Sequence, residues 1–292
     1  MSGIRIILTL FFLVSTITFV KGLEIREGVY EGVPHFIIHT RTATYYFDKA
    51  GGGISRMIDR FGNDWINFKR EPWGKVPESA ASAFRGIPNA VFQGEDGGCG
   101  HPGFGECVSI RYGPNAILSI SKSGKWEWRW NFYEDYACWE VLKTDTARNF
   151  WLLYEGPVGG SYCPKLSYWG NSTEGPMNNL PDHLGNEHIS GNWQWVYFGR
   201  YDRKTTLFIA QENKDDLEDY FSYMGNSQEG IKAKDGMVVF GFGRSFNNKP
   251  LLHENNRYIL GFWSSKVRNI KQHHIIQNFI LDKLKAIGND PS

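Results

Sequence analysis

Residues 126–132 read WEWRWNF, in which every second side chain is aromatic. Successive side chains of a β-strand point to opposite faces, so this spacing places Trp126, Trp128, Trp130 and Phe132 on one face. Such a stripe is typical of a sandwich core, and stacking on sugar rings is the alternative that the same spacing would serve. Either way, the stretch predicts a strand in an antiparallel sheet.

Short runs of the same kind recur along most of the chain. They span residues 35–39, 44–47, 54–58, 108–111, 117–120, 138–142, 150–154, 195–198, 206–210, 238–242 and 258–263. Gly, Asn, Asp or Pro residues separate them, as expected for turns between strands. No helical pattern lies between these runs, which excludes a parallel βαβ sheet and favours two packed antiparallel sheets. The sequence therefore predicts an all-β antiparallel sandwich.

One helix is expected, at the end of the chain. Ile276, Ile280, Leu284 and Ile287 follow one another at spacings of four, four and three residues within 268–287. This period predicts an amphipathic helix that packs on the outside of a sheet.

The first 22 residues have the pattern of an export signal. Arg5 precedes an apolar stretch at residues 6–20, and Val20-Lys21-Gly22 places small residues at the cleavage positions. The stretch is too short and too rich in Ser and Thr to predict a membrane-spanning helix. We therefore expect a signal peptide at 1–22, a secreted protein, and a single β-sandwich catalytic domain at 23–292, because no repeat or linker divides the remainder.

Charge excludes two classes of partner. Removing the signal takes away Arg5 and Lys21, so the formal net charge changes from +1 to −1. A nearly neutral protein has no field that would attract nucleic acid or an anionic membrane surface. We expect neither partner, and we expect a monomer.

All four cysteines lie after the expected signal. An even number in an exported chain predicts two disulfides. Of the three pairings, we favour Cys99–Cys107 and Cys138–Cys163 because both are local; a reduced metal site is the alternative, but no CxxC spacing occurs. We expect no metal and no cofactor. The acidic run at 215–219 could ligate Ca²⁺ through its carboxylates, but it lacks the spacing of a calcium loop, and a solvated turn is the favoured interpretation.

Two long segments, 69–106 and 156–193, do not follow the strand pattern. Both are rich in Gly, Pro and aromatic residues, and each contains at least one cysteine. Ordered loops of this length are usually functional. The sequence therefore predicts that the functional site lies where these two segments meet.

Residues 44–59, TYYFDKAGGGISRMID, are followed by GNDWI at 62–66. This pattern resembles the first hairpin of the galactose-mutarotase-like sandwich proteins. The resemblance implies a β-supersandwich whose concave sheet holds sugars. The family's catalytic Glu lies late in the chain, whereas the late acids here, Asp235 and Glu254, have turn-like surroundings and supply no clear base.

The rest of the chain is similar in size and composition to compact secreted bacterial polysaccharide lyases, including ulvan lyases. Several of those are jelly rolls, which is the alternative topology. This second resemblance implies β-elimination on a polysaccharide that contains uronic acid. That reaction needs a group that neutralises the uronate carboxylate, a base that removes the adjacent proton, and an acid that protonates the leaving oxygen.

Candidate residues of these types occur in both long segments. We expect Arg85 and Asn89 to neutralise the uronate. We expect His101 or His183, together with Tyr162, to exchange protons. For each residue alone a structural role stays open, such as an ion pair for Arg85 and a turn for His101.

Four further residues are expected to contact the substrate: Trp139, Glu155, Trp169 and His188. The leading hypothesis is a secreted polysaccharide lyase. A noncatalytic carbohydrate-binding protein and a glycoside hydrolase are the alternatives. A hydrolase needs two carboxylates on either side of the scissile bond, for which Glu140, Glu155, Asp182 and Glu187 are eligible.

Overall fold

The computed structural model describes residues 22–70 and 80–288. The expected signal peptide, apart from Gly22, lies outside the described residues, so export stays a prediction. Within the described ranges, no helix is long and apolar enough to cross a membrane.

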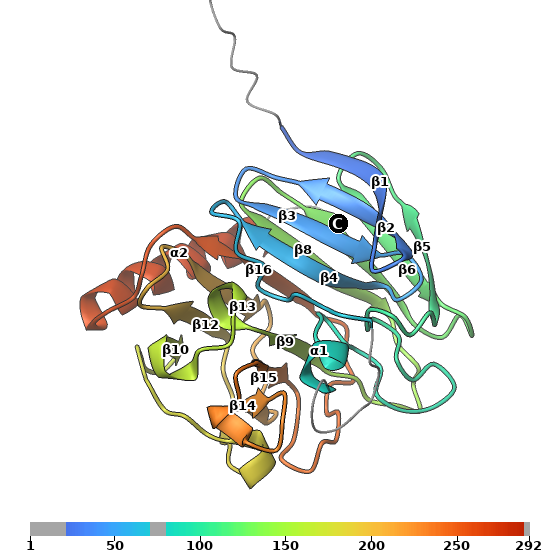
Figure 1. The fold of residues 1–292 in the computed structure, drawn as a ribbon. Coiled ribbons are helices and arrows are strands. Elements are labelled where there is room, and N and C mark those ends of the chain that lie inside the picture. The colour runs from blue at the N-terminus through green and yellow to red at the C-terminus, as the bar shows by residue number, and fades with distance from the viewer. Residues whose placement is uncertain (1–21, 71–79, 289–292) are drawn as a thin grey trace, which may run out of the picture.

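Sixteen strands form three antiparallel sheets in the described part of the chain (Figure 1). The N-terminal sheet has the order β1 (Glu24–Tyr30), β2 (Val33–His39), β3 (Ala43–Asp48), β4 (Gly53–Asp59). The large sheet has the order β10 (Ser167–Asn171), β12 (Trp195–Arg200), β13 (Thr206–Gln211), β16 (Arg257–Trp263), β8 (Tyr136–Lys143), β7 (Glu127–Phe132), β6 (Ala116–Ser121), β5 (Cys107–Arg111). The third sheet has the order β11 (Ile189–Gly191), β14 (Asp219–Gly225), β15 (Gly236–Phe242), β9 (Leu152–Gly156).

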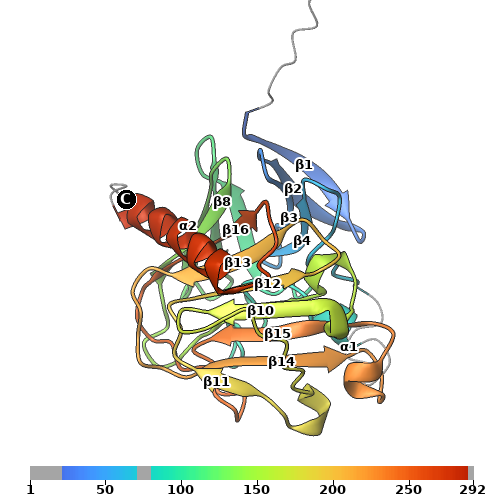
Figure 2. The same cartoon turned by 90° about the vertical axis from the view of Figure 1, so that its left-hand side faces the viewer.

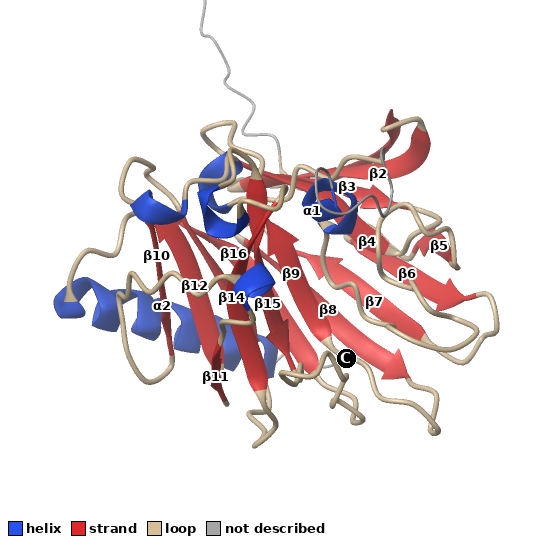
Figure 3. Ribbon diagram, turned by 60° about the horizontal axis from the view of Figure 1, so that its bottom comes forward, coloured by secondary structure: helices blue, strands red, loops and turns tan. Residues whose placement is uncertain are grey.

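Helical segments are few and mostly short. They are α1 (Ala80–Phe84), the 3₁₀ turns η1 (Val158–Gly160), η2 (Pro164–Leu166), η3 (His183–Gly185) and η4 (Gly230–Lys232), and α2 (Ile270–Gly288). Figure 3 shows how small the helical part is beside the strands.

The large sheet forms one layer, and the two smaller sheets pack against its inner face. Tyr45 of β3 meets Phe132 of β7 with ring centroids 5.3 Å apart. In the other half, Tyr154 of β9 lies 5.6 Å from Phe198 of β12, measured between ring centroids. A single buried cluster therefore runs across both halves. The predicted all-β sandwich is confirmed.

The aromatic stripe at 126–132 is core. Trp126, Trp128, Trp130 and Phe132 are each at most 2% exposed, while the residues between them are half-buried. The stripe therefore faces the smaller sheets, and its alternative role as an exposed platform for sugar rings is wrong.

The predicted C-terminal helix is confirmed as α2. Ile276, Ile280, Leu284 and Ile287 are buried against a cluster on the outer face of the large sheet. Figure 2 shows α2 lying across this face.

Both predicted disulfides are contradicted, because all four cysteines are free thiols. Cys99 and Cys107 are neighbours, and the hydrogen bond between them, followed by burial, raises the pKa of the Cys99 thiol. Cys138 lies in the cluster beneath α2, whereas Cys163 lies in the loop that leads into η2. The even number of cysteines in the sequence does not indicate which of them lie close together in the fold.

Candidate active site

A cavity of about 460 Å³ lies on the outer face of the third sheet. Tyr154 and Phe240 point into the sandwich core, so the alternate residues on the same strands point outward. Leu153 and Glu155 of β9 and Val239 of β15 therefore form the floor of the cavity. The walls come from residues 84–104, from His183, and from the turn after β15.

Residues 86–90 extend this sheet beyond its edge strand β9. Gly86 and Glu155 exchange two backbone hydrogen bonds, with N···O distances of 2.9 and 3.1 Å, and Leu153 N donates to Pro88 O at 2.7 Å. Ile87 exchanges two more with Ile54 of β4. The first predicted loop is thus tied to two sheets, which places Asn89 beside Glu155.

Asn89 orients the carboxyl of Glu155. Its φ of 47° lies in the left-handed region, which Asn tolerates better than most residues. Nδ2 donates to Glu155 Oε2 at 2.7 Å and to Phe84 O at 3.1 Å. Among the described residues, Oδ1 has no hydrogen-bond partner although it is buried.

Glu155 is a buried acid with one cation beside it. Burial raises its pKa from 4.5 to about 7, and the opposing effects of Arg244 and Asn89 are smaller. Arg244 Nη1 lies 3.7 Å from Oε1. A carboxyl whose pKa is raised this close to neutral pH suits a group that exchanges protons.

Arg244 is the cation of the cavity. Its guanidinium lies over the rings of Tyr220 and Trp151, at 4.8 and 5.3 Å from their centroids. Nη2 donates to Asn248 Oδ1 at 2.6 Å, while Nε and Nη1 have no hydrogen-bond partner among the described residues. Buried donors without acceptors are costly, and a ligand with acceptor atoms would satisfy them.

His183 begins η3, where Asp182 Oδ1 caps the turn by accepting from Leu184 N at 3.1 Å. Its Nδ1 lies 2.9 Å from Tyr220 Oη and 3.2 Å from Ser222 Oγ. Burial, followed by the charge of Arg244, lowers its pKa to about 4. The ring is therefore neutral at pH 7 and can accept a proton.

His101 also lines the cavity, but both ring nitrogens face backbone carbonyls. Nδ1 lies 2.8 Å from Pro102 O and Nε2 lies 3.0 Å from Phe84 O. Burial lowers its pKa to about 4. These contacts show that His101 stabilises the loop around it. Such a structural role was the alternative to proton exchange.

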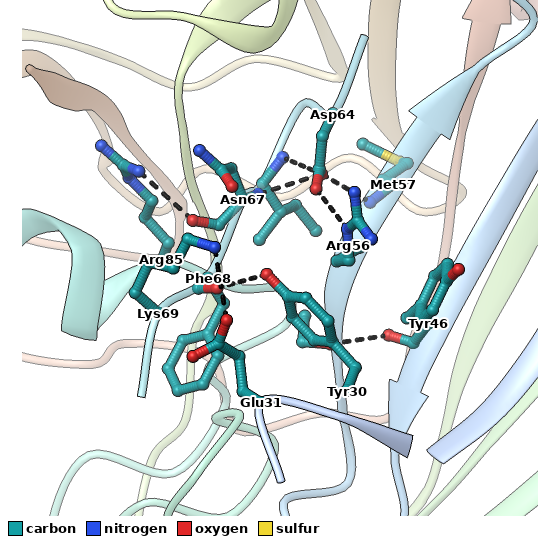
Figure 4. A network of polar contacts seen from close by, with 12 residues as sticks. Tyr30, Glu31, Tyr46, Arg56, Met57, Asp64, Asn67, Phe68, Lys69 and Arg85 are labelled. Atoms are coloured by element: carbon teal, nitrogen blue, oxygen red, sulfur yellow. Dashed lines mark hydrogen bonds and ion pairs between the residues drawn. The ribbon is translucent and has the colours of Figure 1, made fainter. Parts of the chain in front are cut away.

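Arg85 does not line the cavity. Its guanidinium is 1% exposed, pairs with Asp235 at 2.9 Å, and donates to Gly236 O and Asn67 O. Figure 4 shows it in a separate polar network that continues through Asn67 toward Arg56. The ion pair that was the structural alternative for Arg85 is thus present, with Asp235 as the partner.

Four other predicted residues lie outside the cavity lining: Trp139, Trp169, Tyr162 and His188. Trp139 and Trp169 are at most 1% exposed within the core, so their predicted sugar contacts are wrong. The spacing of aromatic residues could not tell the buried face from an exposed one. Tyr162 packs edge-on against Tyr223, with ring centroids 6.5 Å apart.

His188 lies beside the cavity in a stacked column of rings. Its ring is nearly parallel to Tyr220 at 5.3 Å and to Phe246 at 4.3 Å, both measured between centroids. Of the predicted site residues, the structure thus brings Asn89, His101, Glu155 and His183 together.

Sequence reasoning missed Arg244, Trp151 and Tyr220. Arg244 follows the apolar run 238–242 in a Gly-rich turn, where a basic residue gives no signal of burial. Its position became meaningful only through the pairing of β15 with β9.

Solved structures similar to this chain have the sandwich of galactose mutarotases and their relatives. HI1317 aligns with a TM-score of 0.52 and 8% identity over 82% of this chain and 96% of its own. YeaD from Salmonella typhimurium, a candidate mutarotase, aligns with a TM-score of 0.50 and 7% identity over 83% and 94%. A galactose mutarotase related enzyme from Lactobacillus acidophilus gives 0.49 and 9% over 80% and 100%.

No protein-family model matches the chain, and neither does any curated protein sequence. The alignments with solved structures nevertheless show that the protein has a galactose-mutarotase-like β-sandwich fold rather than a jelly roll. The hairpin at 44–66 had indicated the same fold. At identities this low, the likeness concerns the fold alone.

Proposed function

We propose that the protein is a polysaccharide lyase that cleaves a uronic-acid-containing glycan by β-elimination in the Glu155–Arg244 cavity. One observation carries this proposal: a buried guanidinium with two unpartnered donors lies beside a carboxyl whose pKa is raised by burial to about 7. The cavity therefore offers a buried cation and unused hydrogen-bond donors. A carboxylate on the substrate would satisfy both.

Arg244 would hold the uronate carboxylate and stabilise the charge that develops on it, while Asn89 keeps the carboxyl of Glu155 in position. With His183 Nδ1 donating to Tyr220 Oη or Ser222 Oγ, Nε2 carries a lone pair and removes the proton next to the carboxylate. The electron pair of that C–H bond forms the double bond as the glycosidic C–O bond breaks. Protonated Glu155 then gives its proton to the leaving oxygen.

The volume of the cavity and the aromatic residues at its mouth both suit a sugar. About 460 Å³ is within the usual range for small-molecule sites. Phe92 and Phe104 line it while 45% and 41% exposed. Exposed aromatic rings at a cavity mouth offer apolar faces against which pyranose rings can stack.

The test is ultraviolet absorbance of the unsaturated product during incubation with uronate polymers. We expect product from the wild-type protein and a loss of about 100-fold to 1000-fold in kcat for Arg244→Gln, which removes the charge that neutralises the carboxylate. Arg129→Gln is the matched control, because this arginine pairs with Glu140 at 2.6 Å in the large sheet, away from the cavity. Reducing ends without absorbance would indicate hydrolysis instead.

A hydrolase is the weaker alternative because it needs a second carboxylate. Glu155 is the single acidic residue among the described residues that line the cavity. Glu140 pairs with Arg129, and Asp182 caps η3. Binding to a polysaccharide gel without any product would indicate a noncatalytic carbohydrate-binding protein.

Sugar mutarotation is a second candidate, favoured by the fold and by the acid–base pair of Glu155 and His183. It needs a base for the anomeric hydroxyl and an acid for the ring oxygen, but no cation. Polarimetry on freshly dissolved galactose tests it. Faster equilibration that survives Arg244→Gln would favour this reaction over the lyase.

A further inference from the structure

The contact between Glu155 and Arg244 is incomplete. Arg244 Nη1 lies 3.7 Å from Glu155 Oε1, which is beyond hydrogen-bond distance, and neither Nη1 nor Nε finds another partner among the described residues. Glu155 Oε2 is occupied by Asn89 Nδ2 at 2.7 Å. Nε and Nη1 of Arg244 are therefore two separate unused donors in a cavity wall.

Arg244 is the charged group that stabilises ionised Glu155. From residues 84–91, Asn89 presents a neutral amide. From the turn after β15, Arg244 presents its cation. His101 and His183 also line the cavity, and both rings are neutral at pH 7.

We propose that the carboxylate of the substrate accepts a hydrogen bond from the unpartnered Nη1 of Arg244 and displaces this cation from Glu155, so that Glu155 takes up a proton from solvent as the substrate binds. The inference rests on the proposed function and deepens it, since it states how an anionic sugar is recognised. The uptake is a simple protonation of the carboxylate, with water or buffer as the proton source.

Electrostatics supports this coupling. Two anions that share one buried cation repel each other, and a neighbouring like charge raises the pKa of a carboxyl by about one unit or more. Protonation removes the repulsion and leaves the whole cation to the substrate. It also loads Glu155 with the proton that the leaving oxygen needs. A neutral sugar cannot cause this change, so the acid is prepared only when an anionic substrate is bound.

The experiment is titration calorimetry with D-glucuronate as the probe and D-glucose as its uncharged counterpart. Measurements at about pH 7.5 in two buffers with different ionisation enthalpies give the number of protons taken up. For a carboxyl whose pKa is about 7 in the free protein, a rise of one unit or more gives an uptake of about half a proton per glucuronate.

Glu155→Gln should bind glucuronate with no uptake, because it keeps the shape of the side chain but cannot ionise. Glu140→Gln is the matched control, since it removes a carboxylate that pairs with an arginine in the large sheet. Its uptake should equal that of the wild-type protein. A measurement without any variant adds a second test: wild-type affinity for glucuronate should fall as pH rises through 7, by up to about tenfold per unit.

Three results would overturn the proposal: binding of glucuronate without proton uptake, uptake that persists in Glu155→Gln, or affinity for glucuronate no higher than for glucose. Failure of the proposed function would look different. Proton-linked glucuronate binding in a protein that forms no unsaturated product from any uronate polymer would remove the lyase reaction and leave the coupling in place.

Discussion

Ionising Glu155 places a negative charge on a residue that is only 7% exposed. Its pKa of about 7 in the folded protein lies above the ordinary value of 4.5. The folded state therefore binds this proton more tightly than the unfolded state does. The stability gained from the bound proton is complete at a pH below 4.5 and is lost as pH rises through 7.

Glu155→Gln should consequently gain stability relative to the wild-type protein as pH rises. We expect the difference in unfolding free energy to change by about 1–3 kcal/mol between about pH 4 and pH 8, in favour of the variant at high pH. Urea unfolding at several pH values measures it. A difference that stays constant with pH would contradict the raised pKa.

The pH dependence of catalysis should follow the same two residues. In the free protein, kcat/KM should fall below about pH 4, where His183 gains a proton, and above about pH 7, where Glu155 loses one. Initial rates of product formation across this range test the assignment. A rate that keeps rising above pH 8 would show that Glu155 does not act as the acid.

Some residues of the cavity lining could be predicted from polar side chains in irregular segments. Asn89, His101 and His183 were found in this way in the two long loops, and Glu155 was found at a strand end. Arg244 was not, because a basic residue in a turn is normally solvated. Its burial depends on Trp151 and Tyr220, which belong to strands and loops far away in the sequence.

At the scale of elements, the fit of residues 98–103 against β4 holds the cavity wall in place. Gly53 of β4 passes so close to this loop that an added Cβ would lie 2.1 Å from Gly100 O. That same oxygen accepts from Asn89 N at 3.0 Å. A displacement here is therefore transmitted to the residue that orients Glu155.

Gly53→Ala should push the loop away and lower kcat/KM by about 100-fold, since small misplacements of catalytic groups have effects of that size. Gly288→Ala is the control, because an added Cβ there meets its nearest atom at 3.5 Å. Steady-state kinetics on both variants, with circular dichroism to verify folding, makes the comparison. Full activity of Gly53→Ala would mean that the loop does not position the site.

The helix α2 should affect stability without affecting chemistry. It covers the outer face of the large sheet, whereas the cavity lies on the outer face of the third sheet. Ile280→Ala should cost about 2–5 kcal/mol through the hole it leaves. Its kcat/KM in the folded fraction should equal that of the wild-type protein, and a large kinetic defect would reveal an unexpected connection between the two faces.

The elements themselves were predicted unevenly. Alternation identified β7, and the spacing of four, four and three residues identified α2. The strand β14 was missed because an acidic run typical of a turn precedes it and Ser222 interrupts its apolar residues. Burial on both faces alone does not hide a strand, because β12, β13 and β15 are equally buried and were predicted from their apolar runs.

At the scale of the whole molecule, the sandwich could be predicted from the strand count and from the hairpin at 44–66. The division into three sheets could not, because it depends on pairings between distant strands. The pairing of β15 with β9 brings Arg244 close to Glu155, and no local feature of the sequence encodes it. The site is thus a property of the topology more than of any motif.

The position of β16 has a consequence for biosynthesis. This late strand pairs with β13 on one side and β8 on the other, so it joins the two halves of the large sheet. A ribosome must therefore release almost the entire chain before the sheet can close, and β8 and β13 present unpaired edges until then. We expect a chain that stops at residue 256 to aggregate on expression, and a chaperone that shields strand edges to raise the yield of the full-length protein.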